Sequence, residues 1–342
     1  MKKMTSYLPG FALALAIAAV AKFLEGLLPI HLIGASVIAL FLGMIVNHFH
    51  KPGKVIKPGL AFTSKKILKF AIILLGASLS IGTILHVGRL SLTVMIFTLL
   101  TCFGGGYFVG RALKLNWKLS NLISAGTGIC GGSAIAAIAP VIDAEDRDIA
   151  YAISATFLFD MAMIVLFPIM GQAMGLSDMA YGLWAGTAVN DTSSVVAAGY
   201  AFSEAAGDFA TMVKLTRTLA IIPTVITFAL VNVHLKRKAA AAAGSSQEIH
   251  ARFSVTKIFP WFILLFVALA LVNSTGLIPV WLSSGLKSVS KFLMVAALAA
   301  IGLNTNFKEM KRSGFTPMIH GFIISLLVVI VAIVVQFFMG LV

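Results

Sequence analysis

The chain has 342 residues, of which 59% are hydrophobic and only 11% are charged, whereas soluble globular domains are about 45–50% apolar and about 25% charged. A mean hydropathy of +1.01 leaves too little polar surface to solvate a compact particle, which excludes a soluble enzyme with one membrane anchor. The formal net charge of +14 does not indicate nucleic-acid binding here, because the basic residues lie in short loops between apolar runs.

The apolar runs are long enough for membrane-spanning helices, each of which needs about 20 mostly apolar residues. No alternating ten-residue pattern of a β-barrel occurs in the sequence, so the predicted fold class is an all-α polytopic membrane protein. In chain order, the eleven predicted spans are Leu8–Phe23, Ile33–Val46, Ile67–Leu85, Leu90–Val109, Leu119–Ile142, Ile149–Met170, Met179–Phe202, Met212–Val233, Phe259–Val272, Val289–Leu303 and Pro317–Met339.

The distribution of Lys and Arg orients these spans. With a cytoplasmic N-terminus, 18 of the 26 basic residues fall on one side of the membrane, as the positive-inside rule requires. We therefore predict a multi-pass protein of the cell inner (cytoplasmic) membrane, with the C-terminus outside. The opposite loops are predicted to carry the acidic residues Glu25, Asp143, Glu145, Asp146, Asp148, Glu204 and Asp208.

Two features concern the ends and the division of the chain. Lys2 and Lys3 before an apolar run also fit a cleavable signal peptide, and the charge pattern leaves this open. The Ala-, Gly- and Ser-rich stretch after Lys236 is typical of a linker. The predicted division is residues 1–235 as a membrane bundle of spans 1–8, residues 236–257 as a cytoplasmic linker and residues 258–342 as a bundle of spans 9–11.

Glycine spacing suggests an internal repeat. Gly76 and Gly88 are twelve residues apart, and so are Gly302 and Gly314, at a constant offset of 226 residues. The charge pattern makes the third and tenth spans antiparallel, which favours the inverted-topology repeats of many secondary transporters. Because glycine is common in membrane helices, two chance matches are the alternative explanation.

Two predicted spans are interrupted by small polar residues. The segment Ser124–Ser133 resembles Trp184–Ser193, and glycine at four of ten positions in the first disfavours a continuous helix. We predict that the residues around Gly128–Ser133 and Asn190–Ser194 are non-helical and face each other across a polar cavity near the bilayer midplane, with tight helix packing as the alternative. The eleven-span topology makes these two spans parallel, whereas an inverted repeat requires antiparallel ones, and the sequence leaves this conflict open.

Ionisable residues within apolar spans mark candidate functional positions, because a charge at the centre of a membrane helix costs about 2.5–3.5 kcal/mol. Lys214 is expected to extend to an interface, and Arg217 to lie deeper, where it binds an oxyanion or pairs with Asp191. Asp160 is either a proton carrier or the partner of a buried base.

These features define a predicted binding site for a small-molecule anion. Asp191 and Asp160 are the predicted ion-coupling residues, for Na⁺ or H⁺. Because the sequence has no metal-ligand spacing and no nucleotide-binding motif, we expect no metal, no cofactor, no catalytic residue and no enzymatic activity. The lipid bilayer is the expected environment, and the sequence leaves a homodimer open. The predicted substrate-binding residues are Thr127, Gly128, Cys130, Gly131, Gly132, Ser133, Asn190, Thr192, Ser193 and Arg217.

Four motifs also carry a family resemblance. The segments Gly126–Ser133, Asn190–Gly199, Lys214–Arg217 and Gly302–Thr305 resemble those of the bacterial sulfate exporter family of YeiH-type inner-membrane proteins. The resemblance covers nearly the whole chain. It implies a secondary active transporter, an exporter of a small anion such as sulfate, sulfite or a sulfonate, with the first span retained.

The resemblance also bears on the alternatives. Gly126–Ser133 looks like the interrupted helix of bile-acid sodium symporters, so the alternative is a cation-coupled symporter of larger organic anions. An intramembrane enzyme or sensor is a third interpretation, for which the sequence supplies neither a metal motif nor a nucleophile–base pair. Many proteins that the chain resembles carry His at the Asn190 position and Gln at the Ser194 position. A proton-coupling role at Asn190 is therefore not expected here.

Overall fold

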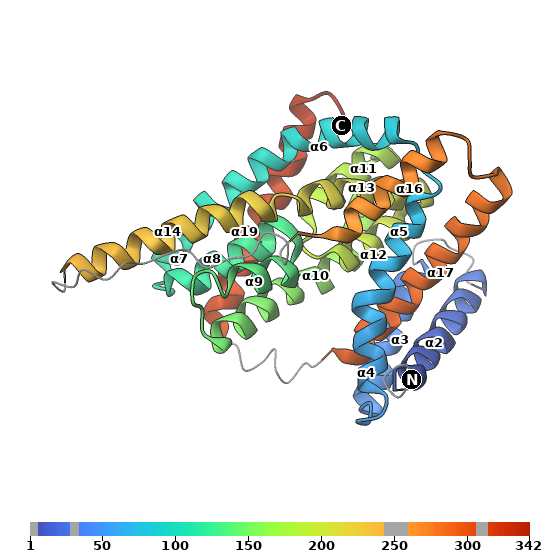
Figure 1. Cartoon of the computed structure of the whole chain (residues 1–342), viewed down its shortest axis with the longest axis horizontal. Helices are drawn as coiled ribbons and strands as arrows, with labels where there is room; N and C mark the ends of the chain where they lie inside the picture. Colours follow the sequence, from blue (N-terminus) through green and yellow to red (C-terminus); the bar gives the residue numbers. More distant parts are fainter. Residues whose placement is uncertain (1–5, 28–33, 243–258, 306–313) are drawn as a thin grey trace.

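The computed structural model describes residues 6–27, 34–242, 259–305 and 314–342, and every regular element within them is helical (Figure 1). Three of the elements are short π-helical turns within longer helices. In chain order, the elements are α2 (Leu8–Leu27), α3 (Ala35–Phe49), α4 (Lys57–Phe62), η1 (Thr63–Ile67), α5 (Leu68–Gly76), α6 (Ile81–Leu100), η2 (Thr101–Gly105), α7 (Gly106–Ala112), α8 (Trp117–Ala125), η3 (Gly126–Cys130), α9 (Gly132–Ile138), α10 (Asp146–Ala173), α11 (Asp178–Ala188), α12 (Thr192–Phe202), α13 (Glu204–Thr218), α14 (Ile221–Ala242), α16 (Trp261–Ser274), α17 (Val280–Asn304) and α19 (Phe315–Phe338).

The described helices confirm an all-helical multi-pass chain. Within the described residues, 6 helices are long and apolar enough to cross a membrane, and α3 and α16 are shorter apolar helices. The predicted number of eleven spans is not confirmed. One boundary is also shifted: the prediction placed Ile67–Leu85 in one span, whereas the chain turns at Ala77–Ser80, where the Ser80 hydroxyl accepts a hydrogen bond from Thr83 N at 3.1 Å and caps α6.

The helices group into two bundles (Figure 1). Bundle A comprises α2 to α5 with α16 and α17, and bundle B comprises α6 to α14 with α19. In bundle A, a Cβ atom on Gly302 would lie 2.1 Å from Leu40 O, so only glycine allows α3 and α17 to pack this closely. The division in space therefore differs from the predicted division along the chain, since α16 and α17 pack with the N-terminal helices.

Helices α5 and α17 of bundle A are antiparallel, as the charge pattern predicted for the third and tenth spans. Ser283 Oγ donates to Ala77 O at 2.9 Å, and Ser290 Oγ donates to Ala71 O at 2.6 Å. Residue numbers therefore increase along α17 in the direction in which they decrease along α5. Antiparallel packing is what an inverted repeat requires, and the repeat itself stays a prediction.

The fifth predicted span, Leu119–Ile142, does not cross the bundle. It forms hairpin 1, in which α8 and η3 run inward, the chain turns at Gly131, and α9 returns. Lys118 Nζ donates to Asp143 O at 2.7 Å, although the two residues are 25 positions apart. A segment that crossed the hydrocarbon would separate its two ends by about 30 Å, so the prediction of a crossing here is wrong.

The base of hairpin 1 is closed by Asp143, which adopts a φ of 50°, a conformation that Asp tolerates better than most residues. Asp143 Oδ2 accepts hydrogen bonds from Lys236 Nζ at 2.6 Å and from Asn232 Nδ2 at 2.9 Å. The Lys236 ammonium and then the Asn232 amide hold the pKa of this carboxyl below its ordinary value of 3.8. These contacts place the base of hairpin 1, Lys118 and the far part of α14 at one end of bundle B, the Lys118 end.

The seventh predicted span, Met179–Phe202, is also a hairpin rather than a crossing. In this hairpin 2, α11 and α12 meet at a tip around Asn190. At its base, Ser203 Oγ donates to Asp178 Oδ1 at 2.6 Å, and along the pair Tyr181 Oη donates to Ala198 O at 2.9 Å. The single helix α10 separates the bases of the two hairpins, so hairpin 2 enters from the opposite end of bundle B, the Glu204 end.

These two corrections remove the conflict in the predicted topology. Two fewer crossings leave the predicted sides of both chain ends unchanged, but they reverse α10. Asp143, Asp146 and Asp148 then lie on the same side as Lys118, not on the side of Glu204 as predicted. The two hairpins enter from opposite ends, which is the antiparallel relation that the eleven-span topology did not allow.

The predicted linker begins within a helix. Residues 236–242 continue α14, which extends to Ala242. Residues 243–257 of that linker lie outside the described residues. Between α13 and α14 the helix is interrupted after Thr218, just before Pro223, whose missing N–H leaves one carbonyl of the preceding turn without its helical partner.

Candidate functional site

The tips of the two hairpins touch at mid-depth in bundle B. Gly131 has a φ of +63°, which strongly favours glycine, and a Cβ atom at this position would lie 2.9 Å from Asp191 Cβ. The chain therefore turns sharply at Gly131, and the two interruptions face each other as predicted, but at Gly131 and Asp191 they are in direct contact rather than across a cavity. Their local structure also differs in part from the prediction, because Gly126–Cys130 forms the π-helical turn η3, α9 begins at Gly132 and α12 begins at Thr192.

Arg217 of α13 joins both hairpins and is fully buried. Its Nε donates to Gly128 O at 2.6 Å and its Nη2 to Thr127 O at 2.5 Å, both in hairpin 1. Its Nη1 donates to Val189 O of hairpin 2 at 3.4 Å. The guanidinium thus binds the carbonyl ends of the first halves of both hairpins, where the helix dipole is negative.

Lys214, one helical turn before Arg217, was predicted to extend to an interface, and this is wrong. The side chain is fully buried. Its ammonium donates to Val189 O at 3.0 Å and also to Asn190 O. Spacing of three residues puts both cations on one face of α13, and that face is turned toward the hairpin tips.

Asp160 of α10 holds the tip of hairpin 2 from the other side. Its Oδ1 accepts from Asn190 N at 2.9 Å and its Oδ2 accepts from Asp191 N at 3.0 Å. The carboxylate is buried. Asp160 therefore accepts hydrogen bonds from the two backbone N–H groups just before α12, where the partial positive charge of the helix N-terminus lies.

Asp191 caps α12 rather than pairing with Arg217. Its Oδ2 accepts from Ser193 N at 2.9 Å and also from the Ser193 hydroxyl. This is the hydrogen bond of a helix N-cap, which satisfies a backbone donor that the helix itself leaves free. Among the described residues, no ion pair joins Asp191 to Arg217.

Two buried polar atoms at the tips have no hydrogen-bond partner within the described part of the chain: Thr127 Oγ1 and Asn190 Oδ1. The amide nitrogen of Asn190, in contrast, is 3.4 Å from Ser325 Oγ of α19 and 3.5 Å from Thr156 O. A buried polar atom without a partner costs about 1–3 kcal/mol. Such atoms beside the buried Asp160, Lys214 and Arg217 are typical of a binding site.

The predicted site residues thus converge. Thr127, Gly128, Cys130, Gly131 and Asn190 are buried at the junction, together with Ser193 and Arg217. Gly132, Asp191 and Thr192 are half-buried and Ser133 is exposed, so these four line the accessible side of the tips. Their roles in substrate binding stay predictions.

Sequence reasoning missed three contributors. Lys214 was assigned to an interface, and Ser325 was not singled out in its apolar helix. Cys102 was not singled out either, although its Sγ would lie 3.2 Å from a Cβ atom on Gly128, beside the tip of hairpin 1. The signal for Lys214 was present, since it shares a helix face with Arg217. For Ser325 and Cys102 the sequence offers only polarity within a span.

Comparison with known proteins places the chain in a family. The family model described as "Conserved hypothetical protein 698" matches residues 9–321. The chain belongs to this family. A UPF0324 membrane protein of Clostridium tetani is 56% identical over 337 residues, covering 98% of each chain.

Streptococcal relatives match over the same extent. UPF0324 membrane proteins of Streptococcus pyogenes and Streptococcus mutans are 40% and 38% identical over 342 residues, again with 98% of each chain covered. The relatives are named as membrane proteins, and together with the helices of membrane-spanning length they support a multi-pass membrane protein. Their names state no substrate, so the resemblance to sulfate exporters and to bile-acid symporters stays a prediction.

Proposed function

We propose that the protein is a secondary active transporter that moves a small anion, such as sulfate, sulfite or a sulfonate, across the cell inner membrane. The observation that supports it most is the meeting of two hairpin tips, entering from opposite ends of bundle B, around the buried side chains of Arg217, Lys214 and Asp160. Interrupted helices that meet at mid-depth are the usual way in which secondary transporters build a substrate site.

The helix ends at the tips favour an anion. Arg217 and Lys214 already satisfy the negative, carbonyl ends of the first hairpin halves. The positive, N–H ends of the second halves, α9 and α12, point toward the accessible side lined by Ser133 and Thr192. An oxyanion bound there would receive backbone N–H groups and hydroxyls, which are its preferred donors.

The charges at the tips suggest how transport is coupled. The site contains two cations, Lys214 and Arg217, and two carboxylates, Asp160 and Asp191, so it is neutral when all four are charged. A bound sulfonate would leave one uncompensated negative charge, and a bound sulfate two, in a medium of low dielectric, which is costly. Binding of H⁺ or Na⁺ at Asp160 or Asp191 for a monoanion, or at both for sulfate, would restore the balance and free N–H groups of α12 for the anion.

The proposed orientation follows the positive-inside rule. We place the Lys118 end of bundle B in the cytoplasm and the Glu204 end outside. The small residues on the accessible side of the tips, Gly132, Ser133 and Thr192, favour a small anion over the larger organic anions of the alternative proposal. We propose transport and no enzymatic activity.

Proteoliposomes containing the purified protein test this function. We expect radiolabelled sulfate, sulfite or an alkylsulfonate to accumulate several-fold above protein-free liposomes when an inward H⁺ or Na⁺ gradient is imposed. An ionophore that removes the gradient should abolish the excess. Accumulation of bile-acid-sized anions alone would favour the alternative substrate class. If no anion in the panel moves under either gradient, the proposed function is wrong.

A further inference from the structure

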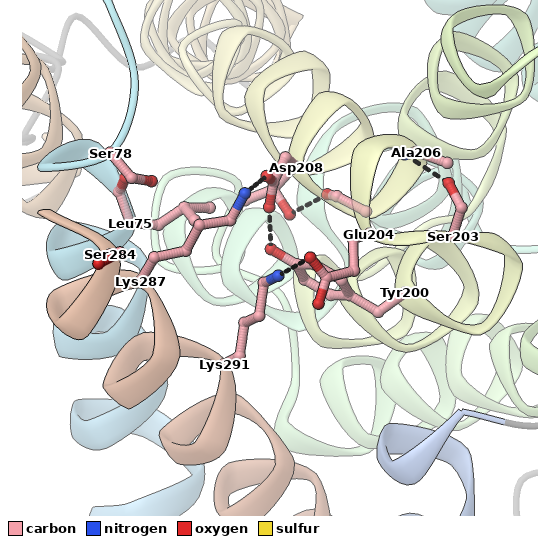
Figure 2. Close-up of polar contacts among 12 residues, drawn as sticks. Leu75, Ser78, Tyr200, Ser203, Glu204, Ala206, Asp208, Ser284, Lys287 and Lys291 are labelled. Carbon is pink, nitrogen blue, oxygen red and sulfur yellow. Dashed lines mark hydrogen bonds and ion pairs between the residues drawn. The ribbon is translucent and has the colours of Figure 1, made fainter. Parts of the chain in front are cut away.

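The contact between bundles A and B has a polar part at the Glu204 end. Lys287 and Lys291 lie one turn apart on α17 of bundle A, and both point toward the corner where α12 meets α13 in bundle B (Figure 2). Lys287 Nζ is 2.5 Å from Asp208 Oδ2, and Lys291 Nζ is 2.6 Å from Glu204 Oε2. Two ion pairs therefore join the bundles side by side.

Tyr200 connects the two pairs. Its hydroxyl donates to Asp208 Oδ1 at 2.5 Å, so both oxygens of that carboxylate are bound (Figure 2). The Lys291 ammonium lies 5.7 Å from the centre of the Tyr200 ring, within the range of a cation–π contact. Tyr200 and Asp208 come from adjacent helices of bundle B, so bundle B presents the acidic half as one preformed unit.

These ion pairs differ from ordinary surface pairs in burial. Each pair has one largely buried side chain, Asp208 at 10% and Lys291 at 17% exposed, and its partner is more open, Lys287 at 31% and Glu204 at 77%. In the pair of Glu145 and Arg147 within bundle B, both side chains are more than 60% exposed. Charges that are largely buried are screened less by water and salt. Separation of the bundles would leave the Asp208 carboxylate and the Lys291 ammonium without a partner in a poorly hydrated place.

The rest of the bundle interface is less directional. Apolar side chains of α3 and α12 share one core, and a Cβ atom on Gly34 would lie 3.1 Å from Tyr200 O, so the backbones approach closely there. Apolar surfaces and small residues allow sliding, since their energy depends on the area buried more than on register. The ion pairs, in contrast, specify one relative position of α17 and the α12–α13 corner.

The position of this corner links the contact to the hairpin tips. Tyr200 lies in α12, whose other end is capped by Asp191, and Asp208 lies in α13, which carries Lys214 and Arg217. A displacement of bundle A from the corner would therefore act on the two helices that build the tip junction. It would also open the side of bundle B from which hairpin 2 enters.

We propose that Lys287 and Lys291 of α17, with Tyr200, Glu204 and Asp208 of bundle B, form a latch that holds the two bundles together at the Glu204 end, and that the latch opens during the working cycle of the protein. The latch itself needs no assumption about the cargo. Its place in a cycle rests on the proposed transport function.

The distance between spin labels on the two sides of the latch tests the proposal. Ser284→Cys on α17 and Ala205→Cys on α13 give labelling positions on exposed residues that the latch does not use. The native Cys102 and Cys130 are buried. In detergent or nanodiscs we expect one predominant short distance for the otherwise unchanged chain.

Neutral variants should open the latch without burying an unpaired charge. In Lys287→Met/Asp208→Asn combined with Lys291→Met/Glu204→Gln, we expect the ratio of long to short distances to rise roughly tenfold, as fits the loss of two ion pairs that each have one largely buried side chain. The exchange variant Lys287→Asp/Asp208→Lys, made with Lys291→Met/Glu204→Gln kept in place, should restore much of the short distance. Arg147→Met, which removes an exposed pair within bundle B, should leave the distribution unchanged.

The outcomes separate this inference from the proposed function. An unchanged distance distribution in the neutral variant, with a thermal melt that still shows a folded protein, would overturn the latch even if anions are transported. A longer distance in the neutral variant that the exchange variant reverses would support the latch even if no anion moves in proteoliposomes. If the neutral variant does not fold, the exchange variant alone decides, and failure to keep the short distance contradicts the latch.

Discussion

Replacement of Arg217 by alanine should have the largest effect of any single substitution at the tips. The change removes the guanidinium donors to Thr127 O and Gly128 O of hairpin 1 and one of the donors to Val189 O of hairpin 2, which keeps its hydrogen bond from Lys214. Loss of a buried charged partner costs roughly 3–5 kcal/mol, which corresponds to a fall in apparent Tm of about 10 °C. We also expect loss of transport, because the tips of hairpins 1 and 2 are no longer joined.

Two further variants define the role of Arg217. Arg217→Lys should recover only part of the stability, since a single ammonium cannot reach carbonyls on both hairpins as the planar guanidinium does. Arg111→Ala is the matched control, because this exposed arginine donates a hydrogen bond to the Tyr107 hydroxyl, its one side-chain hydrogen bond within the described part of the chain. An Arg217→Ala protein with an unchanged Tm would contradict the bridging role. A variant with normal stability but weakened anion binding would instead support the prediction from the sequence that Arg217 contacts the oxyanion directly.

Replacement of Asp160 by asparagine should loosen the tip of hairpin 2. Both carboxylate oxygens accept hydrogen bonds from backbone N–H groups. The side-chain amide of asparagine would place its NH₂ group, a donor, opposite one of these N–H donors. The penalty for such a buried donor without a partner, about 2–3 kcal/mol, should speed hydrogen exchange at Asn190 and Asp191 by roughly 100-fold. Mass spectrometry of the exchanged protein would measure it on peptides that cover the tip.

The control for Asp160 is Asp178→Asn at the base of the same hairpin. The Ser203 hydroxyl donates to Asp178 Oδ1 at 2.6 Å, and an amide oxygen accepts this bond equally well. Exchange at the tip should therefore stay as in the unchanged chain. Equal protection of the tip in Asp160→Asn would show that Asp160 does not hold hairpin 2, and its carboxylate would then be free for ion coupling alone.

The sequence predicted the class of fold well because membrane helices are specified by apolar length, which composition reveals directly. It failed at hairpins 1 and 2 for a physical reason. Each hairpin is about as long and as apolar as a span, so hydropathy cannot separate the two. The basic loops do not help either, since removal of two crossings keeps most of them on the predicted side. The contacts across the two bases settle the matter: Lys118 with Asp143 in hairpin 1, and Ser203 with Asp178 in hairpin 2.

The sequence predicted which residues form the candidate site, but not which groups they contact. Glycine and small polar residues at Gly131 and Asn190 marked the tips, because such residues disfavour a continuous helix. The partners of Arg217, however, are backbone carbonyls, and no side-chain pattern identifies them in advance. For the same reason the pairing of Arg217 with Asp191 was a natural but mistaken expectation: opposite charges nearby in a fold do not pair when the backbone offers each a closer partner.

Labelling of single cysteines tests most directly the central claim that two hairpins enter the bundle from opposite ends. Lys118→Cys and Asp146→Cys flank hairpin 1 and α10, and Ala205→Cys follows hairpin 2. A membrane-impermeant maleimide applied to intact cells should label the Ala205→Cys variant and neither of the other two. Applied to inverted vesicles, it should label the Lys118→Cys and Asp146→Cys variants and leave Ala205→Cys unlabelled. Labelling of Asp146→Cys together with Ala205→Cys from one side, and of Lys118→Cys from the other, would mean that residues 117–142 cross the membrane, and would contradict the account.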